Sequence, residues 1–229
     1  MKRFFVLAFM LVSFLSLSCF TTAHADLIYP NIYIGQQIKF ADGPGKTNGG
    51  EFIVYPLNST TELFRSFCLE TDEYLNFSST FIVKDISTEA RDGGSGGDSP
   101  DPISAYTAYL YHNFYWETLD QYAYDNKATT EFANRDLSAD ALQKAIWHFE
   151  QETRGETNFY TDLAIKAVDK DRSWSGLGDV RVINLVYADG TRAQDQLTVA
   201  PVPEPATMLL LGAGLIGLAG IGRKKLKTA

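Results

Sequence analysis

The sequence predicts an α+β fold, in which an antiparallel β-sandwich or barrel carries a helical insertion and a cleavable transmembrane segment follows near the C-terminus. Runs rich in β-branched and aromatic residues, separated by turn signals, occupy both ends of the central region. Between them the hydrophobic pattern takes the period of helices. Strands, then helices, then strands are typical of a sheet with inserted helices. The chain contains no Rossmann or phosphate-loop pattern.

The strands are expected to lie on either side of the helices. Loop 41–50, which contains Asp-Gly-Pro-Gly and Asn-Gly-Gly steps, separates the first two strands, and Asp189-Gly190 is the turn between the last two. The predicted strands are 29–40, 52–55, 63–69, 80–86, 180–187 and 194–199.

Three helices are expected in the middle of the chain. The first runs over 102–117, with Asp101 as its cap and Pro102 in its first turn. The second runs over 139–152, where Ser138 can cap its start and Gly155 follows its end. The third covers 158–170.

Residues 1–25 have the layout of a secretory signal peptide. Lys2 and Arg3 precede an apolar run over 4–20, and Ala23-His24-Ala25 forms a small-x-small cleavage site. Cys19 allows a lipoprotein signal as the lesser alternative, but Ser16 stands where such signals favour leucine. We therefore expect export and cleavage before Asp26, which leaves residues 26–200 as one domain large enough for a core.

The C-terminal segment, 201–229, has three parts in sequence. Pro203-Glu204-Pro205 precedes a glycine-rich apolar span at 206–222, long enough to cross a thin bilayer, and a basic cluster from Arg223 to Lys227 follows it. This arrangement resembles the PEP-CTERM sorting signal of Gram-negative bacteria. The resemblance implies recognition by exosortase, a precursor anchored in the inner membrane, cleavage near the triplet, and a mature protein at the cell surface or in the extracellular matrix.

The composition of residues 26–200 narrows the choice of partners. They contain 27 acidic and 14 basic residues, a balance that argues against nucleic acid as a partner. No spaced metal-ligand set or nucleophile motif is present, so we expect no catalytic residue, no metal, no cofactor and no enzyme activity. Tract 91–101 holds one Gly-Gly-x-Gly-x-Asp copy; without a tandem neighbour it predicts a mobile loop rather than a calcium site.

Cys68 is the one cysteine left after removal of the signal peptide. It can be an inert buried thiol, an intermolecular bridge or a reactive group. Its most informative partner is Gln143, which the second predicted helix places on one side with Ile146 and Trp147. A thiol held against an amide can displace ammonia and form a thioester. His148 is predicted to point away from Gln143, which makes it a weak candidate for a base.

Two segments resemble the signatures of bacterial surface thioester domains. They are Phe67-Cys68-Leu69-Glu70 and Leu142-Gln143-Lys144-Ala145-Ile146-Trp147. The resemblance implies a Cys68–Gln143 thioester that attaches to surface amines or hydroxyls, with Trp147 and Ile146 as its cover against water. Leu142 departs from the family pattern, in which many members have Thr before the glutamine.

Two functions of different classes remain open from the sequence. The first is a covalent adhesin that tethers the cell or its exopolysaccharide matrix to a target. The second is a structural or carbohydrate-binding matrix protein, whose aromatic residues contact sugars and whose cysteine is inert. In isolation, Phe67 and Cys68 are ordinary strand residues, and Leu142, Ile146 and Trp147 are an ordinary core stripe.

Overall fold

The computed structural model describes residues 29–46, 49–91 and 99–200. The predicted signal peptide 1–25, most of the glycine-rich tract, and segment 201–229 with its span 206–222 lie outside the described residues. Within the described part, no helix combines the length and the apolar character needed to cross a bilayer.

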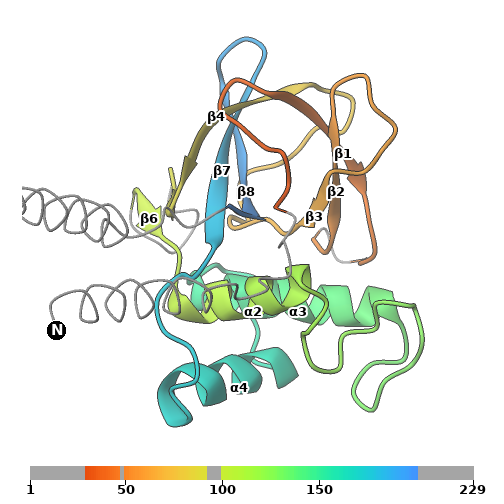
Figure 1. Cartoon of the computed structure of the whole chain (residues 1–229), viewed down its shortest axis with the longest axis vertical. Helices are drawn as coiled ribbons and strands as arrows, with labels where there is room; N and C mark the ends of the chain where they lie inside the picture. Colours follow the sequence, from red (N-terminus) through yellow and green to blue (C-terminus); the bar gives the residue numbers. More distant parts are fainter. Residues whose placement is uncertain (1–28, 47–48, 92–98, 201–229) are drawn as a thin grey trace, which may run out of the picture.

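Strands from both ends of the domain join in one antiparallel sheet of order β3-β2-β1-β4-β7-β8 (Figure 1). Every neighbouring pair in it is antiparallel, as predicted. A separate two-stranded pair joins β5 to β6. The bounds are β1 (Gln37–Asp42), β2 (Phe52–Pro56), β3 (Phe64–Ser66), β4 (Phe81–Ser87), β5 (Glu89–Ala90), β6 (Asp101–Pro102), β7 (Val180–Tyr187) and β8 (Arg192–Val199).

The sheet curls until its two edges approach, but it does not close into a barrel. Beyond β3, Cys68 forms a single antiparallel bridge with Gln196 of β8. The Leu69 N–H donates to the Asp195 carbonyl, and the Leu197 N–H donates to the Phe67 carbonyl. We call this contact the seam. The predicted sandwich or barrel is thus one curled antiparallel sheet of six strands that is not closed, because β3 is too short to form a ladder with β8.

The inserted helices lie between β6 and β7 in the chain, where the sequence placed them. Helices α2 (Ala105–Tyr115) and α3 (Arg135–Phe149) pack across one end of the curled sheet, and α4 (Phe159–Ile165) lies on their far side (Figure 1). A π-helical turn, η1 (Lys166–Lys170), continues α4. The mixed α+β class with a helical insertion is confirmed.

Several predicted boundaries shift. The first strand begins at Gln37 rather than Tyr29, since Pro30 has no N–H to donate and Gly35 turns the chain with a positive φ. Asp101 and Pro102 pair in β6 instead of starting a helix, and Ser104 caps α2. Asn134, not Ser138, caps α3.

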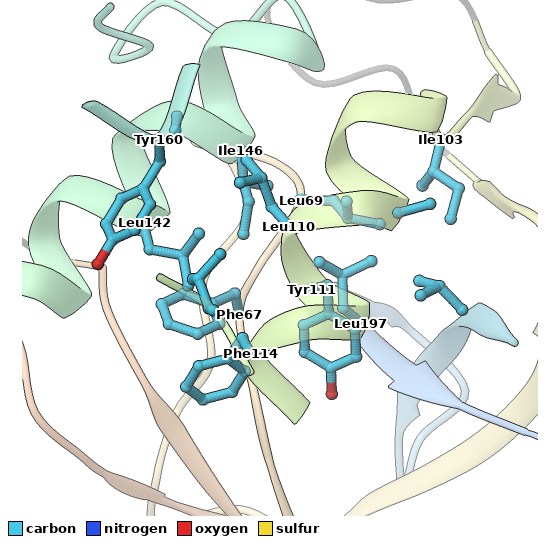
Figure 2. Packing of buried hydrophobic residues seen from close by; sticks show 14 of the residues in the cluster. Phe67, Leu69, Ile103, Leu110, Tyr111, Phe114, Leu142, Ile146, Tyr160 and Leu197 are labelled. Carbon is cyan, nitrogen blue, oxygen red and sulfur yellow. The ribbon is translucent and has the colours of Figure 1, made fainter. Parts of the chain in front are cut away.

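Apolar side chains form two cores that meet at the seam. One core lies between the helices and the sheet end and includes Phe67, Tyr111, Leu142 and Leu197 (Figure 2). The other fills the interior of the curled sheet and includes Cys68 and Trp147. Along β1 and β2 the buried residues alternate with more exposed ones, which is the pattern of a strand with one face inside. Consecutive residues at the seam thus enter different cores.

Candidate functional site

The seam determines where the Cys68 side chain lies. Phe67 and Leu69 enter the helical core, while Cys68 between them enters the core inside the sheet, as expected for an extended segment. Cys68 is fully buried and has no disulfide partner. The predicted reactive residue is therefore held in the interior, against the helices that cover the sheet end.

Gln143 on α3 meets Cys68 at this point, which brings the two predicted partners together. Gln143 Nε2 donates to the Cys68 carbonyl oxygen at 2.8 Å, and the Cys68 N–H donates to Gln143 Oε1 at 3.3 Å. Cys68 Sγ lies 3.4 Å from the same Oε1. Both side chains are fully buried. We refer to these two residues as the Cys68–Gln143 pair.

Two backbone N–H groups converge on Oε1, the side-chain carbonyl oxygen of Gln143. One is the N–H of Cys68, and the other is the N–H of Gly50, at 3.4 Å. Such donors polarise a carbonyl and stabilise negative charge on its oxygen. The site therefore contains a thiol, an amide carbonyl beside it, and an arrangement of donors resembling an oxyanion hole.

The described residues of loop 43–50, which we call the glycine loop, lie on α3 beside the pair. The Lys46 N–H donates to Asp140 Oδ1 at 2.7 Å, and Lys46 Nζ pairs with Asp136 at 3.2 Å. A Cβ at Gly49 would stand 2.6 Å from the Trp147 ring and 2.7 Å from Gln143 Cγ. Glycine is thus required where this backbone passes over the pair.

A buried carboxylate holds the end of the glycine loop. Glu51 accepts from Arg135 Nε at 2.6 Å, from Arg65 Nη1 at 2.7 Å and from the Tyr122 hydroxyl at 2.5 Å. These partners come from α3, from β3 and from the chain between α2 and α3. The sequence analysis missed this cluster, because a single acid after a Gly-Gly step carries no signal of burial.

The two predicted cover residues lie in different cores. Trp147 is 2% exposed and packs in the core that contains Cys68, whereas Ile146 packs in the helical core with Phe67 and Leu69. The residue beside the thiol is therefore Trp147. Its indole Nε1 is buried.

A pocket of about 400 Å³, which we call the entrance pocket, lies on the other side of Trp147 and Gly49. Acidic, aromatic and amide side chains line it, and Lys46 is the cation among the described residues of the lining. Its lining includes Asp42, Glu70, Glu73, Tyr74, Phe77 and Gln194. Trp147 and Gly49 line this pocket and also contact the site, so this is where a small molecule could approach the pair.

Burial dominates the electrostatics of the site. It raises the pKa of the Cys68 thiol, and the nearby carboxyl of Glu70 raises it further, while the indole N–H of Trp147 acts in the opposite direction. Burial also raises the pKa of Glu70 well above its ordinary value, with Asp195 and Glu73 adding to the rise. Burial thus favours the neutral thiol of Cys68 and the protonated carboxyl of Glu70.

The described part of the chain contains no cluster that could bind a metal ion, and its His148 lies outside the entrance pocket. No group of three or more His, Cys, Asp or Glu residues there could hold a metal ion. His148 packs edge-on against Phe149 and does not line the entrance pocket.

The comparison with known families concerns the C-terminal segment. A family model for the PEP-CTERM protein-sorting motif matches residues 201–224. The chain carries a PEP-CTERM sorting motif. This confirms the predicted sorting signal, which includes Pro203, Glu204 and Pro205, and implies an exported protein that exosortase processes from a membrane-anchored precursor. No curated protein and no solved structure matches the chain.

Proposed function

We propose that the exported domain stores an acyl group as an internal thioester between Cys68 and Gln143, and uses it to attach covalently to an amine or a hydroxyl on a target surface or matrix. The observation that carries this proposal is the 3.4 Å separation of Cys68 Sγ from Gln143 Oε1 in a site closed to solvent. Sγ would attack the carbonyl carbon bonded to this oxygen, and a thiol and an amide held in contact gain a large effective concentration over the free groups.

The geometry supports each part of bond formation. The Cys68 sulfur attacks the side-chain carbonyl carbon of Gln143, and the charge that develops on Oε1 is stabilised by the N–H groups of Cys68 and Gly50. The amide nitrogen then leaves as ammonia, and the thiol proton is part of that ammonia. The new bond joins sulfur to the carbonyl carbon.

In the attachment step the Cys68 sulfur, which was the nucleophile in bond formation, becomes the leaving group. An amine or hydroxyl that enters past Trp147 attacks the same carbonyl carbon, forms an amide or ester with it, and releases the Cys68 thiol. Exclusion of water is a requirement of this function, because water competes as the nucleophile. Full burial of the pair and the packing of Trp147 and Gly49 support it.

The intact mass of fresh protein, purified without amine buffers, tests this proposal. We expect a mass one ammonia below that of the sequence, no alkylation of Cys68 by a thiol reagent, and simultaneous methylamine addition and thiol release. Cys68→Ser and Gln143→Glu keep the shapes of the two side chains and should each remove the response to methylamine. A full sequence mass with a freely alkylated Cys68 would refute the proposal.

The entrance pocket favours a second candidate, a carbohydrate-binding matrix protein. Tyr74 is 66% exposed and Phe77 is 43% exposed, and they lie with Asp42, Glu73 and Gln194 around the same opening. Aromatic faces beside carboxylate and amide groups fit a sugar. In this case the host exopolysaccharide should retain the protein and its Cys68→Ala variant equally, and Tyr74→Ala should weaken retention. Loss of retention in Cys68→Ala alone would favour the covalent function.

A further inference from the structure

Glu70 is the buried acid of the entrance pocket that lies nearest in sequence to the thiol. It is 1% exposed and lines the pocket together with Trp147. The Asp195 N–H donates to Glu70 Oε2 at 3.2 Å, and Gln194 Nε2 donates to the Glu70 carbonyl oxygen at 2.8 Å. Glu70 follows Cys68 by two residues in the sequence. Hydrogen bonds from β8 hold both its side chain and its backbone carbonyl.

One oxygen of this carboxyl is available for chemistry. Glu70 Oε1 is buried and has no hydrogen-bond partner within the described part of the chain, and no other acid there has a buried oxygen in that condition. The neighbouring acids are engaged: Asp195 accepts from Asn184 and the Leu185 N–H, and Glu152 accepts from Thr71. A buried polar atom without a partner costs stability and calls for a functional explanation.

We propose that Glu70 is the proton carrier of the Cys68–Gln143 pair. This inference rests on the thioester proposed above and adds a residue to its chemistry. Four observations carry it: the position two residues from Cys68, the shared pocket with Trp147, the burial, and the free Oε1. The raised pKa of Glu70 supports it, because burial favours the protonated carboxyl, and this form has a proton to give.

The protons balance in both directions. During bond formation the Glu70 carboxyl gives its proton to the departing amide nitrogen, and the resulting carboxylate takes the proton of the Cys68 thiol. During attachment Glu70 gives its proton to the departing Cys68 sulfur, and takes one from the attacking amine or hydroxyl. Each cycle leaves Glu70 as it began, so no other acid or base is consumed.

The groups around Glu70 determine how its proton depends on pH. The charged and titratable groups that face it or share its pocket are Cys68, Asp195, Glu73, Asp42, Tyr74 and Lys46. Most of them are acids, and the negative charges of Asp195 and Glu73 oppose the ionisation of Glu70. We therefore expect the rate of bond formation to fall as the pH rises through the titration of Glu70.

The test follows bond formation in the full-length chain, made by cell-free synthesis in mild detergent and sampled for intact mass with time. Glu70→Gln keeps the shape but cannot release a proton, and should slow the appearance of the ammonia deficit at least tenfold and flatten its pH dependence. Glu70→Asp should retain part of the rate. Glu131→Gln, at an exposed glutamate outside the pocket, is the control and should form the bond at the wild-type rate.

The outcomes separate this inference from the proposal beneath it. A wild-type deficit with an unchanged rate and pH profile in Glu70→Gln overturns the role of Glu70 and leaves the thioester in place. A wild-type chain with no deficit overturns both. If Glu70→Gln is slow only because it misfolds, its thermal unfolding transition is lost and Glu70→Asp shows no partial recovery, which also counts against the inference.

Discussion

Cys68 and Gln143, 75 positions apart, exchange hydrogen bonds in both directions: the Gln143 amide donates to the Cys68 carbonyl, and the Cys68 N–H donates to Gln143 Oε1. This double contact prevents rotation of the amide, so its oxygen stays beside the sulfur. A glutamine at the solvent edge of a helix would have no such constraint. The pair is therefore preorganised, and the predictions below depend on what surrounds it.

Trp147→Phe should keep the fold and let the proposed bond form, but shorten its lifetime in water. The smaller ring leaves a gap beside the pair, and water that enters it hydrolyses the thioester. The loss of the ammonia deficit with time in aqueous buffer measures this. Trp174→Phe is the control, because Trp174 packs against Tyr109 and His112 away from the pair. Equal lifetimes in the two variants would contradict a covering role for Trp147.

Gly49→Ala should lower stability by about 1–3 kcal/mol and disturb the pair, because overpacking forces neighbouring side chains to move. The new Cβ meets Trp147 and Gln143 closer than real contacts allow. Urea unfolding and the lifetime of the thioester measure the two effects. Gly190→Ala is the control: its φ is positive but nothing lies within 4 Å, so it should cost some stability and leave the lifetime unchanged.

Glu51→Gln should lower the free energy of unfolding by about 3 kcal/mol, since removing one partner of a buried ion pair leaves the other charges uncompensated. Glu51 is the carboxylate that holds both Arg65 and Arg135. Glu62→Gln is the matched control. Glu62 pairs with Arg65 at the surface, so its loss should cost less than about 1 kcal/mol. Equal losses of unfolding free energy in the two variants, measured by urea unfolding, would contradict a larger contribution from the buried ion pairs of Glu51.

Glu150→Gln should stabilise the protein increasingly as the pH rises from 5 to 8. Burial raises the pKa of Glu150 from its ordinary value of 4.5 to about 7, so the folded state binds the proton more tightly than the unfolded chain. The stability that the protonated Glu150 adds to the folded state is fully present below pH 4.5 and is lost as the pH rises through 7. The glutamine keeps an oxygen for the Ser104 N–H and avoids that loss.

The gain from Glu150→Gln at pH 8 should approach about 3 kcal/mol, from 1.36 kcal/mol for each unit of the pKa rise. Thermal unfolding at a series of pH values measures it. Glu131→Gln is the control at an exposed glutamate. A gain that is constant with pH would show that Glu150 does not titrate as its burial implies.

Replacement of Pro203-Glu204-Pro205 by alanines should leave the protein in the inner membrane of its host, because the sorting motif at 201–224 is no longer recognised for processing. Fractionation of the envelope and the C-terminal peptide of the recovered chain measure this. A matched alanine triplet at exposed positions of the described domain, such as Thr60-Thr61-Glu62, should not affect sorting. Recovery of wild-type chain that still ends at Ala229 would contradict the predicted cleavage.

The sequence alone determined the secondary-structure class, the place of the helical insertion and the sorting motif. These properties depend on local patterns: alternation and turn residues for strands, the 3.6-residue period for helices, and a linear signal at 201–224. The predicted cap of the second helix, Ser138, was wrong, because Asn134 holds the cap position and accepts from the Leu137 N–H. Burial of Ser138 and its bond to the Arg135 carbonyl decide in favour of Asn134.

Only the tertiary structure decided how the site is built. The sequence nominated Cys68, Gln143 and Trp147, but their contact depends on the seam, where one bridge between Cys68 and Gln196 turns the thiol inward. The Gly50 N–H, Glu51 with its two arginines, and the free oxygen of Glu70 carry no local signal. Each depends on groups many positions apart, and only the packing of α3 and the glycine loop onto the curled sheet brings those groups together.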